Sequence, residues 1–249
     1  MKVAQDFRIE IPVLKFSDQI TKARQILRDD RFREVYVVDD TKKLLGYIDI
    51  TDGLRVTATR SNVTVEGYIK DAPEVHAADQ IEQVAREIKK FHTDSAAVVD
   101  GQRHVTGGVL LSDLFPVIIS RHELGGSVLD HMSGNVVTAD ETSPIQHIYT
   151  LIVQSGFSAF PVVRKKKLVG IVSRSDLIRR GRTRTARAHA EHTPVGEIMT
   201  REVITLKPDD LISTAARLLV QHDVSCLPVI DGKAVVGIVD RHDVLTGIR

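Results

Sequence analysis

A polar turn from Ser173 to Asp176 follows the apolar residues 168–172 and precedes a segment with helical patterning. Its hydroxyls and carboxylate are groups that cap helix N-termini, and the free amides of such an N-terminus also attract anions. Arg174, between them, carries a guanidinium that can donate two parallel hydrogen bonds to an anion. The turn is therefore either a local helix cap or part of a ligand site.

The same junction recurs along the chain. Each copy has a glycine followed six residues later by an aspartate, and the pairs are Gly46/Asp52, Gly107/Asp113, Gly170/Asp176 and Gly237/Asp243. The glycines recur about every sixty residues, which is the signature of tandem structural repeats. We expect four repeats, at residues 1–60, 61–120, 121–183 and 190–249.

Each repeat has the pattern strand, amphipathic helix, two strands and a second helix. In the fourth, residues 203–206 are the expected first strand, and apolar residues recur at helical spacing over 211–219. Asp231 and Gly232 then predict a turn between two further strands. The fold class is α/β (α+β) with β-α-β-β-α repeats, and neighbouring repeats should pair to bury the second face of each small sheet.

Composition excludes several classes of protein. A formal net charge of +1 gives no global field toward nucleic acid, which makes that partner unlikely. One cysteine, Cys226, rules out an intramolecular disulfide and fits a reducing compartment. The histidines form no metal-binding motif, and no apolar run is long enough to span a membrane. We expect a cytoplasmic protein.

The repeats resemble the CBS domain, a module named after cystathionine β-synthase. The resemblance is carried by residues 158–163 and 225–230 and by the glycine-to-aspartate junctions; residues 219–229 are similar to the AMP-activated protein kinase γ type. It implies two Bateman modules, residues 1–120 and 121–249, in a pseudo-symmetric disc that is monomeric or a homodimer. It further implies a non-enzymatic regulator that binds an adenine nucleotide (AMP, ADP or ATP), or S-adenosylmethionine as the other ligand, and signals to an unknown partner protein.

The family's ligand motif has a serine or threonine three residues after the glycine and an aspartate three residues later. By resemblance, the hydroxyl and the helix amides face a phosphate, and the aspartate faces the ribose. Repeat three has the full motif in Gly170, Ser173 and Asp176. Its other implied contacts are Arg174, Ser158, Ala159, Phe160 and Pro161, with Ser133, Val136 and Val137 near the adenine.

The other three repeats depart from the motif. Repeat four has Asp240 in place of the hydroxyl, which would repel a phosphate, so its cleft would hold an uncharged adenosyl group, need a bridging cation or be empty. Repeat one has Asp49 there, with Asp52 retained, and repeat two has Leu110. Candidate contacts in repeat four are Thr200, Val203, Ile204, Ser225, Cys226, Leu227, Pro228, Arg241 and Asp243. Arg33, in repeat one, matches a position that carries phosphate-binding basic residues in the family.

Three alternatives stay open. Each motif aspartate could simply cap its helix, and for Asp113 we expect only that role. The chain could also be mainly a structural or interaction module that binds a partner through the arginines from Arg179 to Arg187. The same arginines could contact nucleic acid, although the near-zero net charge argues against it.

Overall fold

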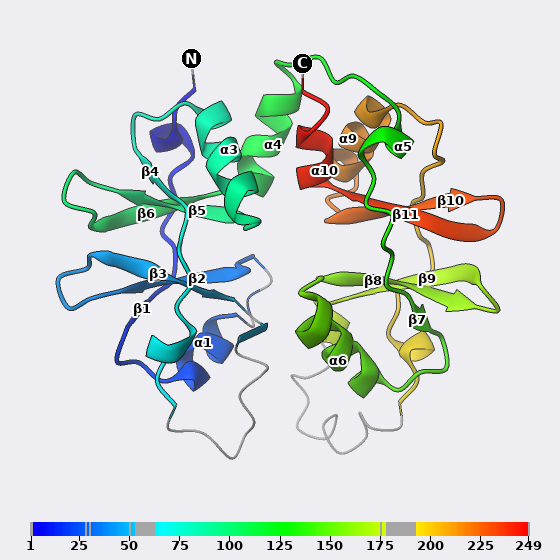
Figure 1. Cartoon of the computed structure of the whole chain (residues 1–249), viewed down its shortest axis with the longest axis horizontal. Coiled ribbons are helices and arrows are strands. Elements are labelled where there is room, and N and C mark those ends of the chain that lie inside the picture. The colour runs from blue at the N-terminus through cyan, green and yellow to red at the C-terminus, as the bar shows by residue number, and fades with distance from the viewer. Residues whose placement is uncertain are drawn as a thin grey trace. The chain divides into compact units, whose positions relative to one another are not determined.

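Each repeat contains an antiparallel hairpin that carries its repeat glycine (Figure 1). The structure is a computed structural model that describes residues 2–27, 29, 31–49, 51–52, 63–174, 176–177 and 193–248. The chain divides into two compact units, Met1–Ser120 (unit 1) and Arg121–Arg249 (unit 2). The segment from Arg179 to Arg187, the partner surface of the alternative function, lies outside the described residues.

Unit 1 contains two three-stranded sheets, ordered β1-β2-β3 and β4-β5-β6. In each sheet the first pair is parallel and the second is antiparallel. The elements of the first repeat are β1 (Val13–Lys15), α1 (Ile20–Ile26), β2 (Glu34–Val38) and β3 (Leu44–Asp49). Those of the second are β4 (Glu74–His76), α3 (Ile81–Phe91), β5 (Ser95–Val99), β6 (Val105–Leu110) and α4 (Leu111–Ile119). The short 3-10 turns η1 (Ala4–Phe7) and η2 (Glu66–Tyr68) precede them.

Unit 2 has a similar arrangement, with one three-stranded sheet, β7-β8-β9, and one two-stranded sheet, β10-β11. Its third repeat has α5 (Val128–His131), β7 (Ala139–Asp140), α6 (Ile145–Ser155), β8 (Ala159–Arg164) and β9 (Lys167–Ser173). Its fourth has η3 (Val195–Glu197), α9 (Ile212–Gln221), β10 (Cys226–Asp231), β11 (Ala234–Asp240) and α10 (Arg241–Leu245). The strand expected over residues 203–206 is wrong, because only Leu206 pairs, with Val229, in a single parallel bridge.

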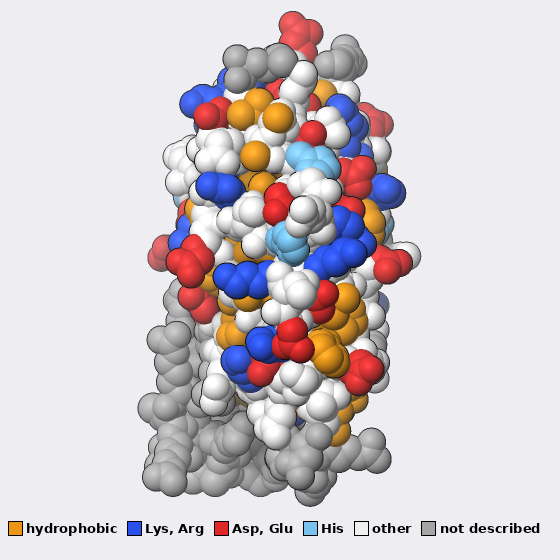
Figure 2. All heavy atoms as spheres, turned by 90° about the vertical axis from the view of Figure 1, so that its left-hand side faces the viewer, with side chains coloured by type: hydrophobic (Ala, Val, Ile, Leu, Met, Phe, Trp, Pro, Cys, Tyr) orange, Lys and Arg blue, Asp and Glu red, His pale blue; other side chains and the backbone are white. Residues whose placement is uncertain are grey.

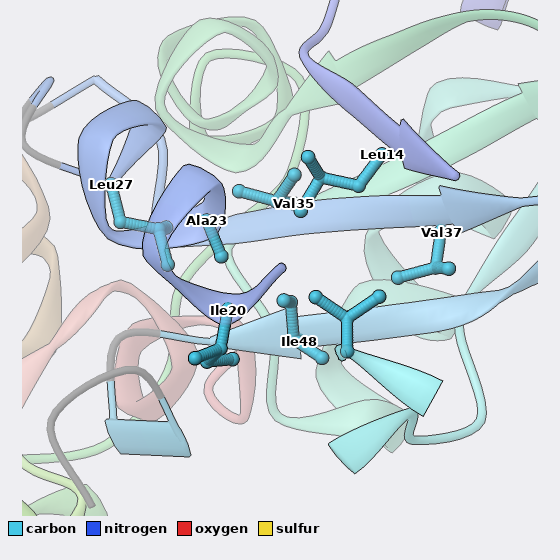
Figure 3. Packing of buried hydrophobic residues seen from close by; sticks show 8 residues of the cluster. Leu14, Ile20, Ala23, Leu27, Val35, Val37 and Ile48 are labelled. Carbon is cyan, nitrogen blue, oxygen red and sulfur yellow. The ribbon is translucent and has the colours of Figure 1, made fainter. Parts of the chain in front are cut away.

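The core of the first repeat shows why these elements form. Ile20, Ala23 and Leu27 follow one face of α1 and its C-cap, and they pack on the inward face of the sheet (Figure 3). The sheet contributes Leu14, Val35, Val37 and Ile48. Val65 completes this cluster although it belongs to the second repeat. The two repeats therefore share a core and cannot be separated without exposing apolar surface.

Paired repeats exchange their leading segments. Lys70, in the leading segment of repeat two, exchanges both backbone hydrogen bonds with Tyr47 on β3, at 2.8 and 2.9 Å. Ile9, in the leading segment of repeat one, does the same with Gly108 on β6, at 2.9 Å in both directions. In unit 2, Ser133 pairs with Ile238 on β11 and Thr200 with Ile171 on β9. Each leading segment thus crosses to the hairpin of the other repeat, beside the residue that follows the repeat glycine.

The predicted α/β class and the tandem repeats are confirmed, and repeat two shows the complete β-α-β-β-α order. Within the described part of the chain, no helix is both long and apolar enough to cross a lipid bilayer.

Candidate functional site

The strand-to-helix junction of repeat three is a reciprocal capping box. The amide and Oγ of Ser173 each donate to Oδ2 of Asp176 at 2.7 Å, and the Asp176 amide lies 3.4 Å from Ser173 Oγ. Capping and ligand binding therefore do not exclude one another here, because both bonds from Ser173 to the Asp176 carboxylate use Oδ2. Both side chains are partly exposed, as a ligand contact requires.

Arg174 follows the capping serine and is 6% exposed. Its amide donates to the Ser158 carbonyl at 2.8 Å, which fixes the start of the turn against β8. Ala159 is directly opposite Ser173 in the β8–β9 ladder. Ser158, Ala159, Ser173 and Asp176 thus lie together, and Phe160 and Pro161, the next two residues of β8, are buried.

Repeat four has the same box built from two carboxylates. The Asp240 amide donates to Asp243 Oδ2 at 2.9 Å, and the Asp243 amide donates to Asp240 Oδ1 at 3.0 Å. Burial, and then the neighbouring Asp240 charge, raises the pKa of Asp243 to about 6. Cys226 is opposite Asp240 in the ladder, and Arg241 Nη2 lies 3.7 Å from Asp223 Oδ1. This junction is electrostatically unfavourable for a phosphate.

The other walls of this junction are similar to those of repeat three. Leu227 is 1% exposed and Pro228 is buried, so both belong to the core, whereas Ser225 is exposed. Positions 158–161 and 225–228 therefore play matching structural roles in the two repeats.

The crossing segments correct the expected grouping of residues. Ser133, expected in the repeat-three site, donates from Oγ to Asp243 Oδ1 at 3.3 Å in repeat four. Thr200, expected in the repeat-four site, pairs with Ile171 two residues before Ser173. The grouping was wrong because each leading segment crosses to its partner. Four half-buried residues lie where these segments return to their own repeats: Val136, Val137, Val203 and Ile204.

The two junction carboxylates of repeat one, Asp49 and Asp52, are paired with Lys70 of repeat two. Lys70 Nζ lies 2.8 Å from Asp49 Oδ2 and 2.7 Å from Asp52 Oδ2. The amides of Thr51 and Asp52 donate to Asp49 Oδ1 at 2.7 and 3.2 Å. Burial alone would raise the pKa of Asp49, yet the Lys70 ammonium holds that pKa below its ordinary value. Asp52 is 2% exposed, and burial followed by the Asp49 charge raises its pKa.

Repeat two lacks the box. Leu110 is the N-cap of α4 and makes no side-chain cap hydrogen bond. Asp113 is exposed and accepts a 3.5 Å bond from Ser112 Oγ. The prediction that Asp113 caps its helix is wrong, because among the described residues its carboxylate accepts from Ser112 Oγ and forms no capping box with the start of α4.

A buried polar network joins the two repeats of unit 1 where unit 2 has small side chains. Ser95 Oγ donates to Glu34 Oε2 at 2.7 Å, the Asp94 amide donates to Glu34 Oε1 at 3.0 Å, and Tyr36 OH lies 2.9 Å from Ser95 Oγ. Arg33, expected to face a phosphate, forms an ion pair with Asp94. Burial, and then the Asp94 charge, raises the pKa of Glu34 to about 7.

This network predicts a pH dependence of unit 1. A carboxyl whose folded pKa is raised contributes stability below its ordinary pKa of 4.5, and that contribution is lost as the pH rises through about 7. The free energy of unfolding of wild-type unit 1 should fall by on the order of 2 kcal/mol between about pH 4.5 and 7.5 through Glu34, and Glu34→Gln should not show this fall. Urea unfolding followed by tyrosine fluorescence measures it, since Tyr36, Tyr47 and Tyr68 lie in unit 1 and only Tyr149 in unit 2. Glu66→Gln, at an exposed glutamate of unit 1, is the control; equal pH profiles for the wild type and Glu34→Gln would contradict the prediction.

Sequence reasoning missed Lys70, Glu34 and Asp94. A signal for Lys70 does exist: Ile9, Lys70, Ser133 and Thr200 each stand 37 residues before the glycine of their own repeat. Nothing comparable marks the Glu34 network. Among the residues that the structure describes, no cluster of three or more His, Cys, Asp or Glu side chains could hold a metal ion.

Comparisons with known proteins agree with this geometry. A sequence model of the CBS domain matches residues 4–58, 126–182 and 195–249, more than half of the chain. The uncharacterized protein MJ1225 of Methanocaldococcus jannaschii is 24% identical over 98% of this chain and 97% of its own length. The CBS domain-containing protein YhcV of Bacillus subtilis is 33% identical over 47% of this chain and 81% of its own length.

The fold is also that of a solved structure. The crystal structure of MJ1225, proposed there as an archaeal homolog of g-AMPK, has a TM-score of 0.81 and 20% identity, covering 98% of this chain and 99% of that one. The family match omits repeat two, where Leu110 interrupts the motif, yet the structure shows the same topology there. The chain belongs to the CBS domain family.

Proposed function

We propose that this chain is a non-catalytic regulator that binds an adenine nucleotide, AMP, ADP or ATP, at the repeat-three junction and signals its occupancy to a partner protein. One observation carries the proposal. Of the four junctions in the described residues, only that of repeat three combines a neutral hydroxyl cap with a partly exposed aspartate. The other three have a carboxylate or a leucine at the cap position.

The chemistry follows from the positions of these groups. Ser173 Oγ would donate to a phosphate once its hydroxyl turns away from Asp176 Oδ2, and Asp176 would accept from the two ribose hydroxyls. Thr200 places a second hydroxyl beside β9. A nucleotide held here would touch β9 of one repeat and the crossing segment of the other. It would therefore favour one packing of the two repeats, by no more than its differential affinity for the two packings.

The repeat-four junction supports a different ligand preference. Asp240 and Asp243 place two carboxylates beside Ser133, so an adenosyl compound without phosphate fits better than AMP. S-adenosylmethionine, whose sulfonium is positive, is the adenosyl ligand that this charge favours.

The test is a calorimetric titration of the whole chain with AMP, ADP, ATP, adenosine, S-adenosylmethionine and NAD. Ser173→Asp gives repeat three the repeat-four pattern and keeps a good helix cap. We expect it to weaken AMP binding by about tenfold or more through charge repulsion, and adenosine binding much less. Equal losses for AMP and adenosine would contradict a phosphate contact at Ser173. No binding of any of these compounds would overturn the proposed function.

A structural role for unit 1 is favoured by its own side chains. Lys70 occupies the repeat-one carboxylates, and the Glu34 network fills the wall between the repeats. Basic and acidic side chains lie interspersed on the face of the molecule in Figure 2. In ion pairs such as Lys15–Asp40 and Arg103–Glu74, the two opposite charges neutralise each other. This surface favours neither nucleic acid nor a strongly charged partner.

A further inference from the structure

Lys70 of repeat two contacts the strand-to-helix junction of repeat one. Its ammonium bridges Asp49 and Asp52, at 2.8 and 2.7 Å, and its backbone is fixed by both hydrogen bonds to Tyr47. The Asp52 side chain is only 3% exposed, whereas that of Lys70 is 38% exposed. The lysine therefore covers the motif carboxylate from the side on which the crossing segment lies.

The four crossing positions differ in a way that matches the junctions they face. Thr200 lies beside the Ser173–Asp176 junction, and Ser133 donates to Asp243. Ile9 faces the repeat-two hairpin, where the cap is Leu110. In unit 2 the crossing residue thus has a short hydroxyl side chain. In unit 1 it is a long cation or an apolar side chain.

We propose that Lys70 is a built-in occupant of the repeat-one junction and decides, with Asp49, that this junction takes no adenosyl ligand. The proposal rests on the proposed function, because it states which of the equivalent junctions binds the nucleotide. Lys70 is a specificity-determining residue supplied by the partner repeat.

The charges explain why the lysine is hard to displace. A ribose that approached Asp52 would have to take the place of an ammonium paired with two carboxylates. Removing the cation would leave a nearly buried carboxylate next to a second one, which is costly. A phosphate would then face Asp49 as well. The lowered pKa of Asp49 and the raised pKa of Lys70 agree with a strong mutual interaction, since burial alone opposes the charge of each.

The experiment grafts the repeat-three pattern into repeat one. Asp49→Ser/Lys70→Thr is made in a chain that also carries Asp176→Ala, and AMP binding is measured by equilibrium dialysis. We expect Asp176→Ala to lose AMP binding and the triple variant to regain one equivalent of AMP per chain. Lys70→Met with Asp176→Ala is the matched control, because it removes the charge but keeps the long side chain and Asp49, and it should bind no AMP.

The reverse graft tests the same idea in unit 2. Ser173→Asp/Thr200→Lys gives repeat three the equivalents of Asp49, Asp52 and Lys70. It should lower AMP affinity further than Ser173→Asp alone, by about another tenfold. A higher affinity than that of Ser173→Asp would show that the lysine binds phosphate and would overturn the proposal. So would a triple variant that is folded by circular dichroism and binds no AMP. If the triple variant fails to fold, the reverse graft decides. Failure of the wild-type chain to bind AMP would instead reject the proposed function.

Discussion

Asp176→Ala should lower the affinity of the chain for AMP and for adenosine alike, by about a hundredfold. The substitution removes the charged acceptor proposed for both ribose hydroxyls, and hydrogen bonds to a charged group contribute about 1.5–3 kcal/mol each. Adenosine should lose as much as AMP because both carry the same ribose. This common loss distinguishes Asp176 from Ser173, whose replacement by aspartate should act mainly on the phosphate. Calorimetric titration with both ligands measures the two effects.

The matched control is Asp113→Ala, which removes the aspartate at the same motif position of repeat two. Asp113 is exposed and outside any capping box, so the variant should bind AMP as the wild type does. Asp176→Ala also removes the capping box of Ser173, which should cost about 1 kcal/mol of folding stability. A thermal melt without ligand separates this cost from the loss of binding. Unchanged AMP affinity in Asp176→Ala would mean that the site lies elsewhere.

Gly46→Ala should destabilise unit 1 by about 3 kcal/mol or more, because the crossing segment leaves no space for a side chain. A Cβ at Gly46 would lie 2.2 Å from the Lys70 carbonyl oxygen and 2.4 Å from Ile69 Cγ2. The carbonyl belongs to the backbone that bonds to Tyr47, so it cannot move without breaking that pair. Urea unfolding followed by tyrosine fluorescence should show the loss.

Gly101→Ala is the control for this substitution. Gly101 has open space around its Cβ position and no left-handed backbone conformation, so the variant should unfold like the wild type. If Gly46→Ala were as stable as Gly101→Ala, the close approach of the crossing segment would not explain the repeat glycine. The same clash recurs at Gly170, where a Cβ would lie 2.9 Å from the Thr200 carbonyl oxygen.

The two units differ at the positions that face their junctions. At the crossing position, unit 2 has Ser133 and Thr200, whereas unit 1 has Lys70 and Ile9. At the strand start, Glu34 and Ser95 of unit 1 stand opposite one another through a buried hydrogen bond, whereas unit 2 has Ala159 and Cys226 at these positions. Lys70 pairs with both carboxylates of the repeat-one junction, whereas Ser133 and Thr200 of unit 2 have short hydroxyl side chains.

The amino-acid sequence was enough to predict the repeat, the α/β class, the family and the junction of Ser173 with Asp176. These are local properties: the capping bonds span three residues, and the helix stripes and hairpin turns are equally short in range. A pattern of residue types along the chain is enough to predict them, because the interacting groups are near neighbours in sequence.

The sequence pattern did not predict which crossing residue faces which junction, because that depends on contacts between residues far apart in the chain. Lys70 bonds to Asp49 across 21 residues, Ser95 to Glu34 across 61, and Ser133 to Asp243 across 110. These contacts exist because each leading segment completes the hairpin of its partner repeat. Assigning each segment to its own repeat therefore grouped Ser133 with Ser173 and Thr200 with Asp240, the reverse of the folded arrangement. Local patterning positions the motif, and the exchange of segments between repeats determines what stands opposite it.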